Sequence, residues 1–240
     1  IETQPSLHEA KIELSLAEGS RNVRRDDSMI KAVVFDMDGT LVDTEKYLVE
    51  YWEKAGKLCG YPMTREDGLF LRSLASEYAV PAMKQRLGED FDYYKVRRCR
   101  IELMDKAGLP TECKPGAKEV LARLKERNIR TAVATASAEE KARRVLTETG
   151  LYDSFSCVIC APDMEHGKPM PDVYLHACRV LGEKPEDCMA VEDSPNGVLS
   201  AFRAGLRTIM VPDLSAPDET IRDCLYGVAE ELTGILKFLD

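Results

Sequence analysis

Short apolar runs alternate along the chain with stretches of helical spacing, and the two patterns predict buried strands and the helices that cover them. Residues 32–35 (A-V-V-F) are apolar throughout, which is typical of a strand buried on both faces of a parallel sheet. The alternation predicts an α/β fold with a doubly wound, Rossmann-like parallel-sheet core. Further strands are predicted at 131–135, 156–160, 188–192 and 207–211, and helices from Pro115 and at 139–149, 172–181 and 195–204.

A second pattern interrupts the core after its first strand. Residues 44–112 are rich in charge and aromatics, have no β-branched run, and show helical spacing at 47–56, 69–78 and 91–108. In the last stretch, positions 93, 96, 97, 100, 101 and 104 share one side, and Gly108 is a plausible C-cap. The predicted organisation is a disordered extension or tag at 1–28, an α/β core at 29–43 and 113–240, and a helical cap at 44–112.

Composition and charge narrow the possible functions. The 240-residue chain is 44% hydrophobic and 31% charged, which is ordinary for a globular protein. The formal net charge of −9 argues against nucleic-acid binding, which requires a basic face. No apolar run reaches the roughly 18 residues of a membrane span. We therefore expect a cytoplasmic monomer with no nucleic-acid or membrane partner, whose eight scattered cysteines are free thiols.

Polar side chains follow four of the predicted strands, where each strand ends. Parallel strands present their carboxyl ends at one edge of a sheet, so these side chains are expected to converge there. Asp36 and Asp38, two residues apart, would repel each other unless a cation or a shared proton relieved the repulsion. The residues expected at this edge are Asp36, Asp38, Thr135, Ala136, Ser137, Lys168, Glu192 and Asp193.

These residue types suit phosphoryl transfer. Carboxylate oxygens are the ligands that Mg²⁺ prefers, and Asp36, Asp193 and Glu192 can supply them. Thr135 and the following backbone N–H groups can bind phosphoryl oxygens, while Lys168 can neutralise both the phosphate and the nucleophile. One carboxylate then remains to attack phosphorus and a second to transfer a proton.

Four motifs in this order resemble those of the haloacid dehalogenase superfamily: D-M-D-G-T-L-V-D-T, V-A-T-A-S, G-K-P-M-P-D and V-E-D-S-P-N-G. The resemblance covers about residues 30–212, and the predicted cap is similar to that of the β-phosphoglucomutase-like and phosphoglycolate-phosphatase-like branch. It implies that Asp36 forms an aspartyl-phosphate and that Asp38 is the acid and base. The dehalogenating members lack an acid at the position of Asp38, so its presence favours phosphate esters.

The resemblance also implies the binding roles. Side chains of Asp36 and Asp193 and the backbone carbonyl of Asp38 would hold Mg²⁺. Glu192 matches a position that assists the metal directly or through water, and Asn196 would support the metal loop. The implied phosphate-binding residues are Thr135, Ala136, Ser137 and Lys168.

Specificity is expected from the cap. Arg72 matches a position at which this branch often carries a basic substrate-contact residue, although an ordinary solvated helix arginine is the other interpretation. Sugar-phosphate mutases of the branch carry histidine at the position of Leu48, and this departure favours hydrolysis. The leading hypothesis is a Mg²⁺-dependent phosphatase of small phosphorylated metabolites such as sugar phosphates. The alternatives are a phosphosugar mutase and a non-enzymatic phospho-acceptor module.

Overall fold

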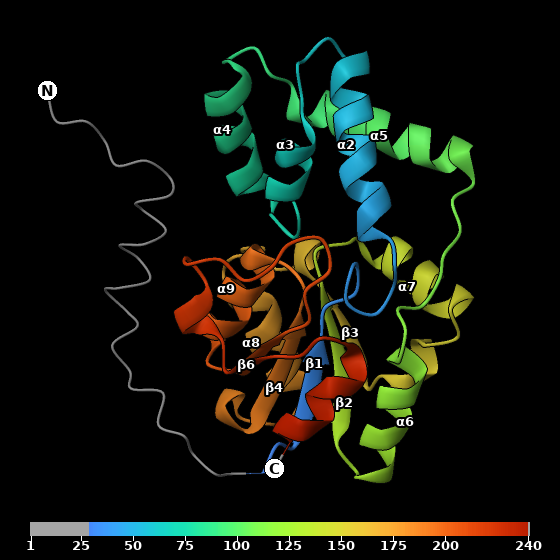
Figure 1. Ribbon diagram of the computed structural model, residues 1–240, viewed down its shortest axis with the longest axis vertical. Helices are drawn as coiled ribbons and strands as arrows, with labels where there is room; N and C mark the ends of the chain where they lie inside the picture. Colours follow the sequence, from blue (N-terminus) through green and yellow to red (C-terminus); the bar gives the residue numbers. More distant parts are fainter. Residues whose placement is uncertain (1–28, 240) are drawn as a thin grey trace, which may run out of the picture.

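A six-stranded sheet forms the centre of the computed structural model, which describes residues 29–239 (Figure 1). All neighbouring strands are parallel, in the order β3-β2-β1-β4-β5-β6. This confirms the predicted α/β fold, while the extension predicted at 1–28 lies outside the described residues. The strands are β1 (Ala32–Phe35), β2 (Arg130–Thr135), β3 (Cys157–Cys160), β4 (Cys188–Glu192), β5 (Arg207–Met210) and β6 (Gly227–Val228).

Helices cover both faces of the sheet because alternate strand residues point to opposite sides. Val33 and Phe35 of β1 pack in an apolar cluster with α6 (Ala117–Glu126) and α7 (Glu139–Glu148). Ala32 and Val34 point the other way and pack with the remaining two core helices. Those helices are α8 (Asp172–Leu181) and α9 (Pro195–Ala204), and a 3₁₀ helix at Leu232–Phe238 joins the first face.

The segment between β1 and α6 forms four helices that lie together beyond one end of the sheet (Figure 1). They enclose an apolar cluster of their own, in which Trp52 and Tyr93 have ring centroids 5.3 Å apart. Trp52 is therefore a core residue of this part. The helices are α2 (Glu45–Leu58), α3 (Arg65–Phe70), α4 (Ser76–Leu87) and α5 (Tyr93–Ala107).

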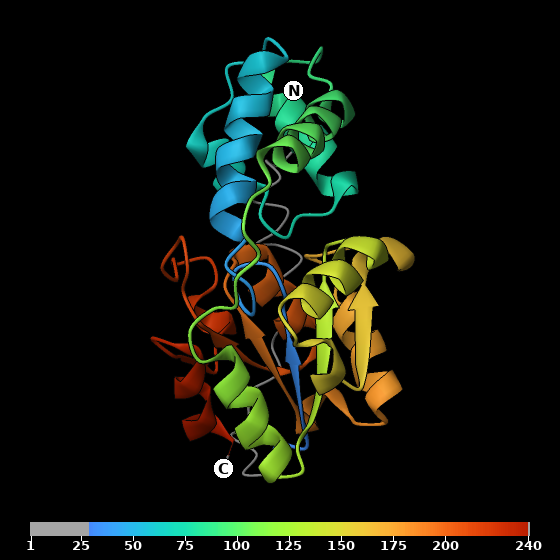
Figure 2. The ribbon, with the colours of Figure 1, turned by 90° about the vertical axis from the view of Figure 1, so that its right-hand side faces the viewer.

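Two chain segments connect this helical part to the sheet, and they run side by side (Figure 2). The Asp43 amide donates to the Glu112 carbonyl at 2.9 Å, and the Lys114 amide donates to the Leu41 carbonyl at the same distance. Two adjacent connections of this kind are what an inserted segment requires. The division at residues 44 and 112 remains a prediction.

Several local predictions were wrong. Residues 69–78 do not form one helix: α3 ends at Phe70, α4 begins at Ser76, and Ser73 between them has a φ of 53°. Helix α6 begins at Ala117 rather than at Pro115, after Gly116 with a φ of 79°.

Two further observations bear on the sequence predictions. All eight cysteines are free, as expected. None of the helices within residues 29–239 is long and apolar enough to cross a membrane.

Candidate active site

Three carboxylates meet at the carboxyl ends of β1 and β4. Asp36 follows β1, Glu192 ends β4 and Asp193 follows it, and one oxygen of each lies within 4.8 Å of the others. All three side chains are buried, Glu192 and Asp193 completely. Burial of like charges at this separation requires nearby cations or protonation of one of the carboxylates.

Lys168 supplies one of these cations. Its side chain is fully buried, and its Nζ donates to Asp36 Oδ1 at 2.6 Å and to Glu192 Oε1 at 2.7 Å. Burial alone would lower the pKa of Lys168, but the charges of Asp36 and Glu192 outweigh it and raise the pKa. Tyr174, which was not predicted, donates its hydroxyl to the same Glu192 oxygen at 2.5 Å. Glu192 therefore anchors the lysine, whatever its role toward a metal.

The two oxygens of Asp36 differ. Oδ1 accepts from Lys168, whereas Oδ2 is buried and has no hydrogen-bond partner among the residues that the structure describes. Burial raises the pKa of Asp36 well above its ordinary value, and Lys168 only partly offsets that effect. A further positive charge near Oδ2 would stabilise the ionised form, which is the form that can attack an electrophile.

Asp38 lies in a different environment. Its carboxylate accepts from Thr44 Oγ1 at 2.5 Å, from Ser137 Oγ at 2.8 Å and from Lys141 Nζ at 3.0 Å. Burial would raise the pKa of Asp38, but the Lys141 ammonium and these hydrogen bonds outweigh burial and lower it. Lys141 was missed, although it lies one helical turn after Ser137, whose hydroxyl it also contacts at 3.0 Å.

The structure places the predicted phosphate-binding loop beside these aspartates. Thr135 is buried at the end of β2, and its Oγ1 accepts from the Ser137 amide at 3.1 Å. Thr135, Ala136 and Ser137 line one cavity together with Asp36 and Asp38. Their arrangement is compatible with phosphate binding, which remains a prediction.

Arg72 lies in the turn between α3 and α4, not in a helix, and it is only 3% exposed. The interpretation of a solvated helix arginine is therefore wrong. Its Nη1 donates to Asp193 Oδ2 at 3.2 Å and its Nη2 donates to Ser215 Oγ. Asn196 Nδ2 donates to the carbonyls of Phe70 at 3.2 Å and Arg72 at 2.8 Å, so the turn is fixed against the start of α9. Direct contact of Arg72 with a substrate remains a prediction.

The donor set fits a divalent cation with hard oxygen ligands. Asp36 Oδ2 is buried without a partner in the described part of the chain, and Asp193 lies close enough to share an ion with it. Glu192 Oε1 is bound closely by Lys168 at 2.7 Å and by Tyr174 at 2.5 Å, whereas the donors to Asp193 are more distant, Thr40 at 3.4 Å and Arg72 at 3.2 Å. The residues that could hold the ion are therefore Asp36 and Asp193 first, with Glu192 less available.

Glu45 is a buried acid at the start of α2, and we expect it to make the stability of the protein depend on pH. Burial, reinforced by the charge of Asp38, raises its pKa to about 8 from an ordinary value of 4.5. Between these values the native state holds a proton that the unfolded chain releases, so this group lowers the free energy of unfolding as pH rises. The stability of Glu45→Gln relative to that of the parent protein should therefore rise by about 2 kcal/mol when the pH is raised from about 5.5 to about 7.5.

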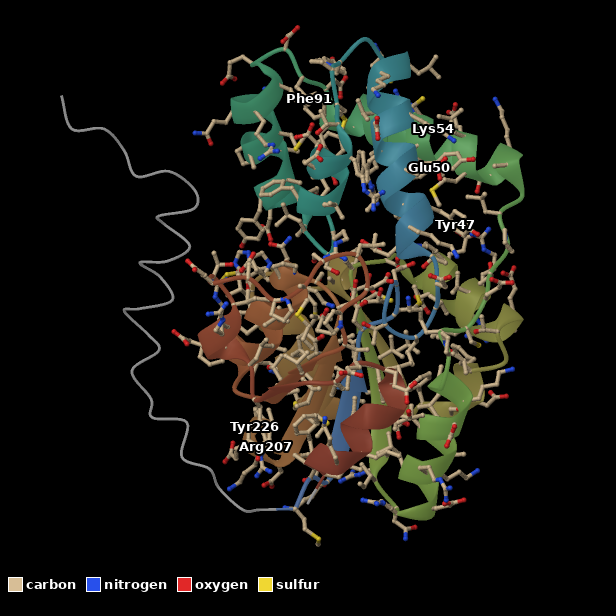
Figure 3. The ribbon with its side chains drawn as sticks, viewed as in Figure 1. Tyr47, Glu50, Lys54, Phe91, Arg207 and Tyr226 are labelled. Carbon is tan, nitrogen blue, oxygen red and sulfur yellow. The ribbon has the colours of Figure 1, made fainter. Side chains whose placement is uncertain are left out.

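Urea unfolding at those two pH values measures this difference. Glu50→Gln is the matched control, because Glu50 lies on the exposed side of the same helix and pairs with Lys54 at 2.5 Å. Figure 3 shows Glu50 and Lys54 farther from the sheet than Tyr47, which lines the cavity. Equal pH dependence in Glu45→Gln and the parent protein would show that Glu45 does not hold this proton.

Comparisons with known proteins find relatives named as phosphatases and as a phosphosugar mutase. The chain is 32% identical over 182 residues to validoxylamine A 7'-phosphate phosphatase of Streptomyces hygroscopicus subsp. limoneus, covering 74% of this chain and 84% of that protein. It is 30% identical over 225 residues to hexitol phosphatase B of Escherichia coli, covering 85% and 95%. It is also 26% identical over 190 residues to the β-phosphoglucomutase of Bacillus subtilis, covering 76% and 83%.

A solved structure shows the same architecture. The crystal structure of CbbY from Rhodobacter sphaeroides in complex with phosphate superposes with a TM-score of 0.71 at 26% identity, covering 88% of this chain and all of that one. The sequence model of the haloacid dehalogenase-like hydrolases matches residues 30–205, which hold all four motifs. The chain thus belongs to the haloacid dehalogenase-like hydrolase family, as those motifs predict.

Proposed function

We propose that this hydrolase is a Mg²⁺-dependent phosphatase of small phosphorylated metabolites, with sugar phosphates as the first class to test. The family and the relatives named as phosphatases support a phosphoric monoester hydrolase. The observation that carries the proposal is Asp36, a buried carboxylate with one oxygen held by Lys168 and the other without a partner among residues 29–239. That arrangement suits a nucleophile that must also contact a cation.

In the proposed reaction, the Asp36 carboxylate attacks phosphorus, the bond to the ester oxygen breaks, and an aspartyl-phosphate forms. Asp38 gives a proton to the departing oxygen and then takes one from the water that cleaves the intermediate. Asp36 and Asp193 would hold a Mg²⁺ ion, which would supply positive charge for the phosphoryl oxygens. Lys168 keeps Asp36 oriented throughout, since its ammonium is buried against that carboxylate.

Asp38 must change partners during this cycle. With Lys141, Thr44 and Ser137 around it, its carboxylate is ionised, which is the form that removes a proton from water. To act as an acid it needs a proton and hence separation from the Lys141 ammonium. We propose that the entering phosphate, which also attracts Lys141 and Ser137, separates them.

We propose different roles for the two parts of the chain. Residues 29–43 and 113–240 would carry the chemistry, with Thr135, Ser137 and Lys168 binding the phosphoryl group. Residues 44–112 would act as a cap that opens at the paired connections and closes over the substrate. Docking of the Arg72 turn on Asn196 and Asp193 is then the closed arrangement.

A phosphosugar mutase is the second candidate, favoured by the similarity to β-phosphoglucomutase. Leu48 argues against it, because this side chain lines the cavity at the position where the mutases of this branch carry histidine. The non-enzymatic alternative receives no support, since the matched family consists of hydrolases.

A panel of phosphorylated metabolites, assayed for released phosphate with and without MgCl₂, tests the proposal. We expect phosphate release from sugar phosphates that stops with EDTA and returns with Mg²⁺. Conversion of a hexose phosphate to its isomer without phosphate release would establish the mutase instead. Undiminished activity in EDTA would contradict the metal dependence.

Gly39 gives a sharper test of the metal site. It has a φ of +89°, and a Cβ there would lie 2.5 Å from Asp193 Oδ2. Gly39→Ala should therefore displace the Asp193 carboxylate and weaken Mg²⁺ binding by about tenfold or more, as calorimetric titration measures.

Gly60→Ala is the matched control. Gly60 has a φ of +92°, so alanine is equally strained there, but its Cβ would meet nothing within 4 Å. Both variants should lose about 1–2 kcal/mol of stability, while only Gly39→Ala should lose metal affinity. Equal Mg²⁺ affinities in the two variants would show that Asp193 is not a ligand of the ion.

A further inference from the structure

We propose that Arg100, assisted by Arg97, binds a second anionic group of the substrate, so that the preferred phosphate ester also carries a carboxylate or a second phosphate. This inference rests on the proposed phosphatase function and specifies its substrate class. The two arginines lie on α5 and line the same cavity of about 870 Å³ as Asp36 and Asp38. Cavities of this size enclose small metabolites.

Arg100 is held in a way that leaves hydrogen-bonding capacity unused. Its guanidinium carbon lies 4.5 Å from the centroid of the buried Trp52 ring. Stacking on the ring fixes the plane of the guanidinium and leaves its edge free to bind an anion. Its Nε is shielded from solvent and has no hydrogen-bond partner within residues 29–239.

The surrounding charges leave Arg100 available to a ligand. Burial and the neighbouring Arg97 guanidinium both lower its pKa, but arginine remains charged at any physiological pH. Of the acids nearby, Asp38 is already bound by Lys141, Ser137 and Thr44. Glu45, the other, is itself favoured in its neutral form by burial.

Arg72, the basic residue that the sequence suggests as a substrate contact, already has protein partners. Its two terminal nitrogens donate to Asp193 and Ser215 on the sheet side. Arg100 instead projects from the helical part, next to Trp52, into a cavity whose other wall carries the reacting carboxylates. An ester with its phosphoryl group at Asp36 and an anion at its other end would therefore bind groups on both sides of the cavity.

Binding can be measured without turnover in the full-length Asp36→Asn protein with Mg²⁺. Calorimetry would compare two matched pairs of ligands: phosphoglycerate with glycerol phosphate, and fructose bisphosphate with fructose monophosphate. The first pair differs by a carboxylate and the second by a phosphate, so the two pairs distinguish the sources of the anion. We expect tighter binding of the doubly anionic member in at least one pair.

Arg100→Met should remove that preference, weakening the doubly anionic ligand by about tenfold or more. Methionine keeps an apolar contact with Trp52, and Arg100→Lys, which keeps the charge, should retain part of the preference. Arg98→Met is the control, since Arg98 is exposed on the same helix and does not line the cavity.

Two results would overturn the inference. One is an equal preference for the doubly anionic ligand in Arg100→Met and Arg98→Met. The other is that the Asp36→Asn protein, with Arg100 intact, shows no preference in either pair of ligands. Failure of the proposed function is separate: it would appear as no phosphate release by the parent protein from any ester, p-nitrophenyl phosphate included. The binding preference would still be measurable in that case.

Discussion

Asp36→Asn should bind phosphate esters but turn them over at least about a hundredfold more slowly than the parent protein. The amide is a poor nucleophile, yet its carbonyl oxygen can still accept from Lys168 as Asp36 Oδ1 does at 2.6 Å. The site should therefore keep its shape while losing the group that attacks phosphorus. Initial rates of phosphate release, together with calorimetric ligand affinity, separate loss of chemistry from loss of binding.

Asp223→Asn is the matched control, because Asp223 is exposed and distant in sequence from the four motifs. It should leave the rate unchanged. A near-normal rate for Asp36→Asn would remove Asp36 from the role of nucleophile, and the proposed order of steps would fail with it.

Lys168→Met should cause the largest loss of stability of any single change considered. Lys168 is fully buried between Asp36 and Glu192, so its removal leaves two buried carboxylates without their cation. Breaking a buried ion pair from one side costs about 3–5 kcal/mol, a large part of the stability of a typical domain. Urea unfolding followed by circular dichroism measures the loss.

A second change keeps this prediction testable if Lys168→Met fails to fold. Adding Glu192→Gln removes one of the uncompensated charges, and the amide oxygen can still accept from Tyr174. The double variant should recover part of the lost stability. Lys184→Met, at a side chain that is 77% exposed, should change stability by less than about 0.5 kcal/mol. A similarly small effect at Lys168 would mean that the pair does not stabilise the fold.

The strands and the catalytic edge could be predicted because their signals are local. The apolar run that precedes Asp36 predicts β1, and every parallel strand ends at the same edge, so the sequence alone places Lys168 and Asp193 near Asp36. Their close approach follows from the topology. The distances, and the unequal partners of the two Asp36 oxygens, depend on side-chain packing that no local pattern encodes.

Other features depend on contacts between distant parts of the chain. The break after α3 could not be predicted from residues 69–78, because their spacing is helical and the carbonyls that end the helix are bound by Asn196 from the other side of the cleft. Lys141 lies near Asp38 only once α7 packs beside the loop after β1. The strand β6 is two residues long and has no periodic signal.

The central claim is that the phosphoryl group passes through Asp36, and trapping the intermediate tests it most directly. The parent protein would be mixed with a radiolabelled phosphate ester and Mg²⁺, quenched in acid during turnover and digested. The account predicts an acid-stable, alkali-labile label on the peptide that contains Asp36, and no label in Asp36→Asn. Turnover with the label on another residue, or labelling that survives in Asp36→Asn, would contradict it.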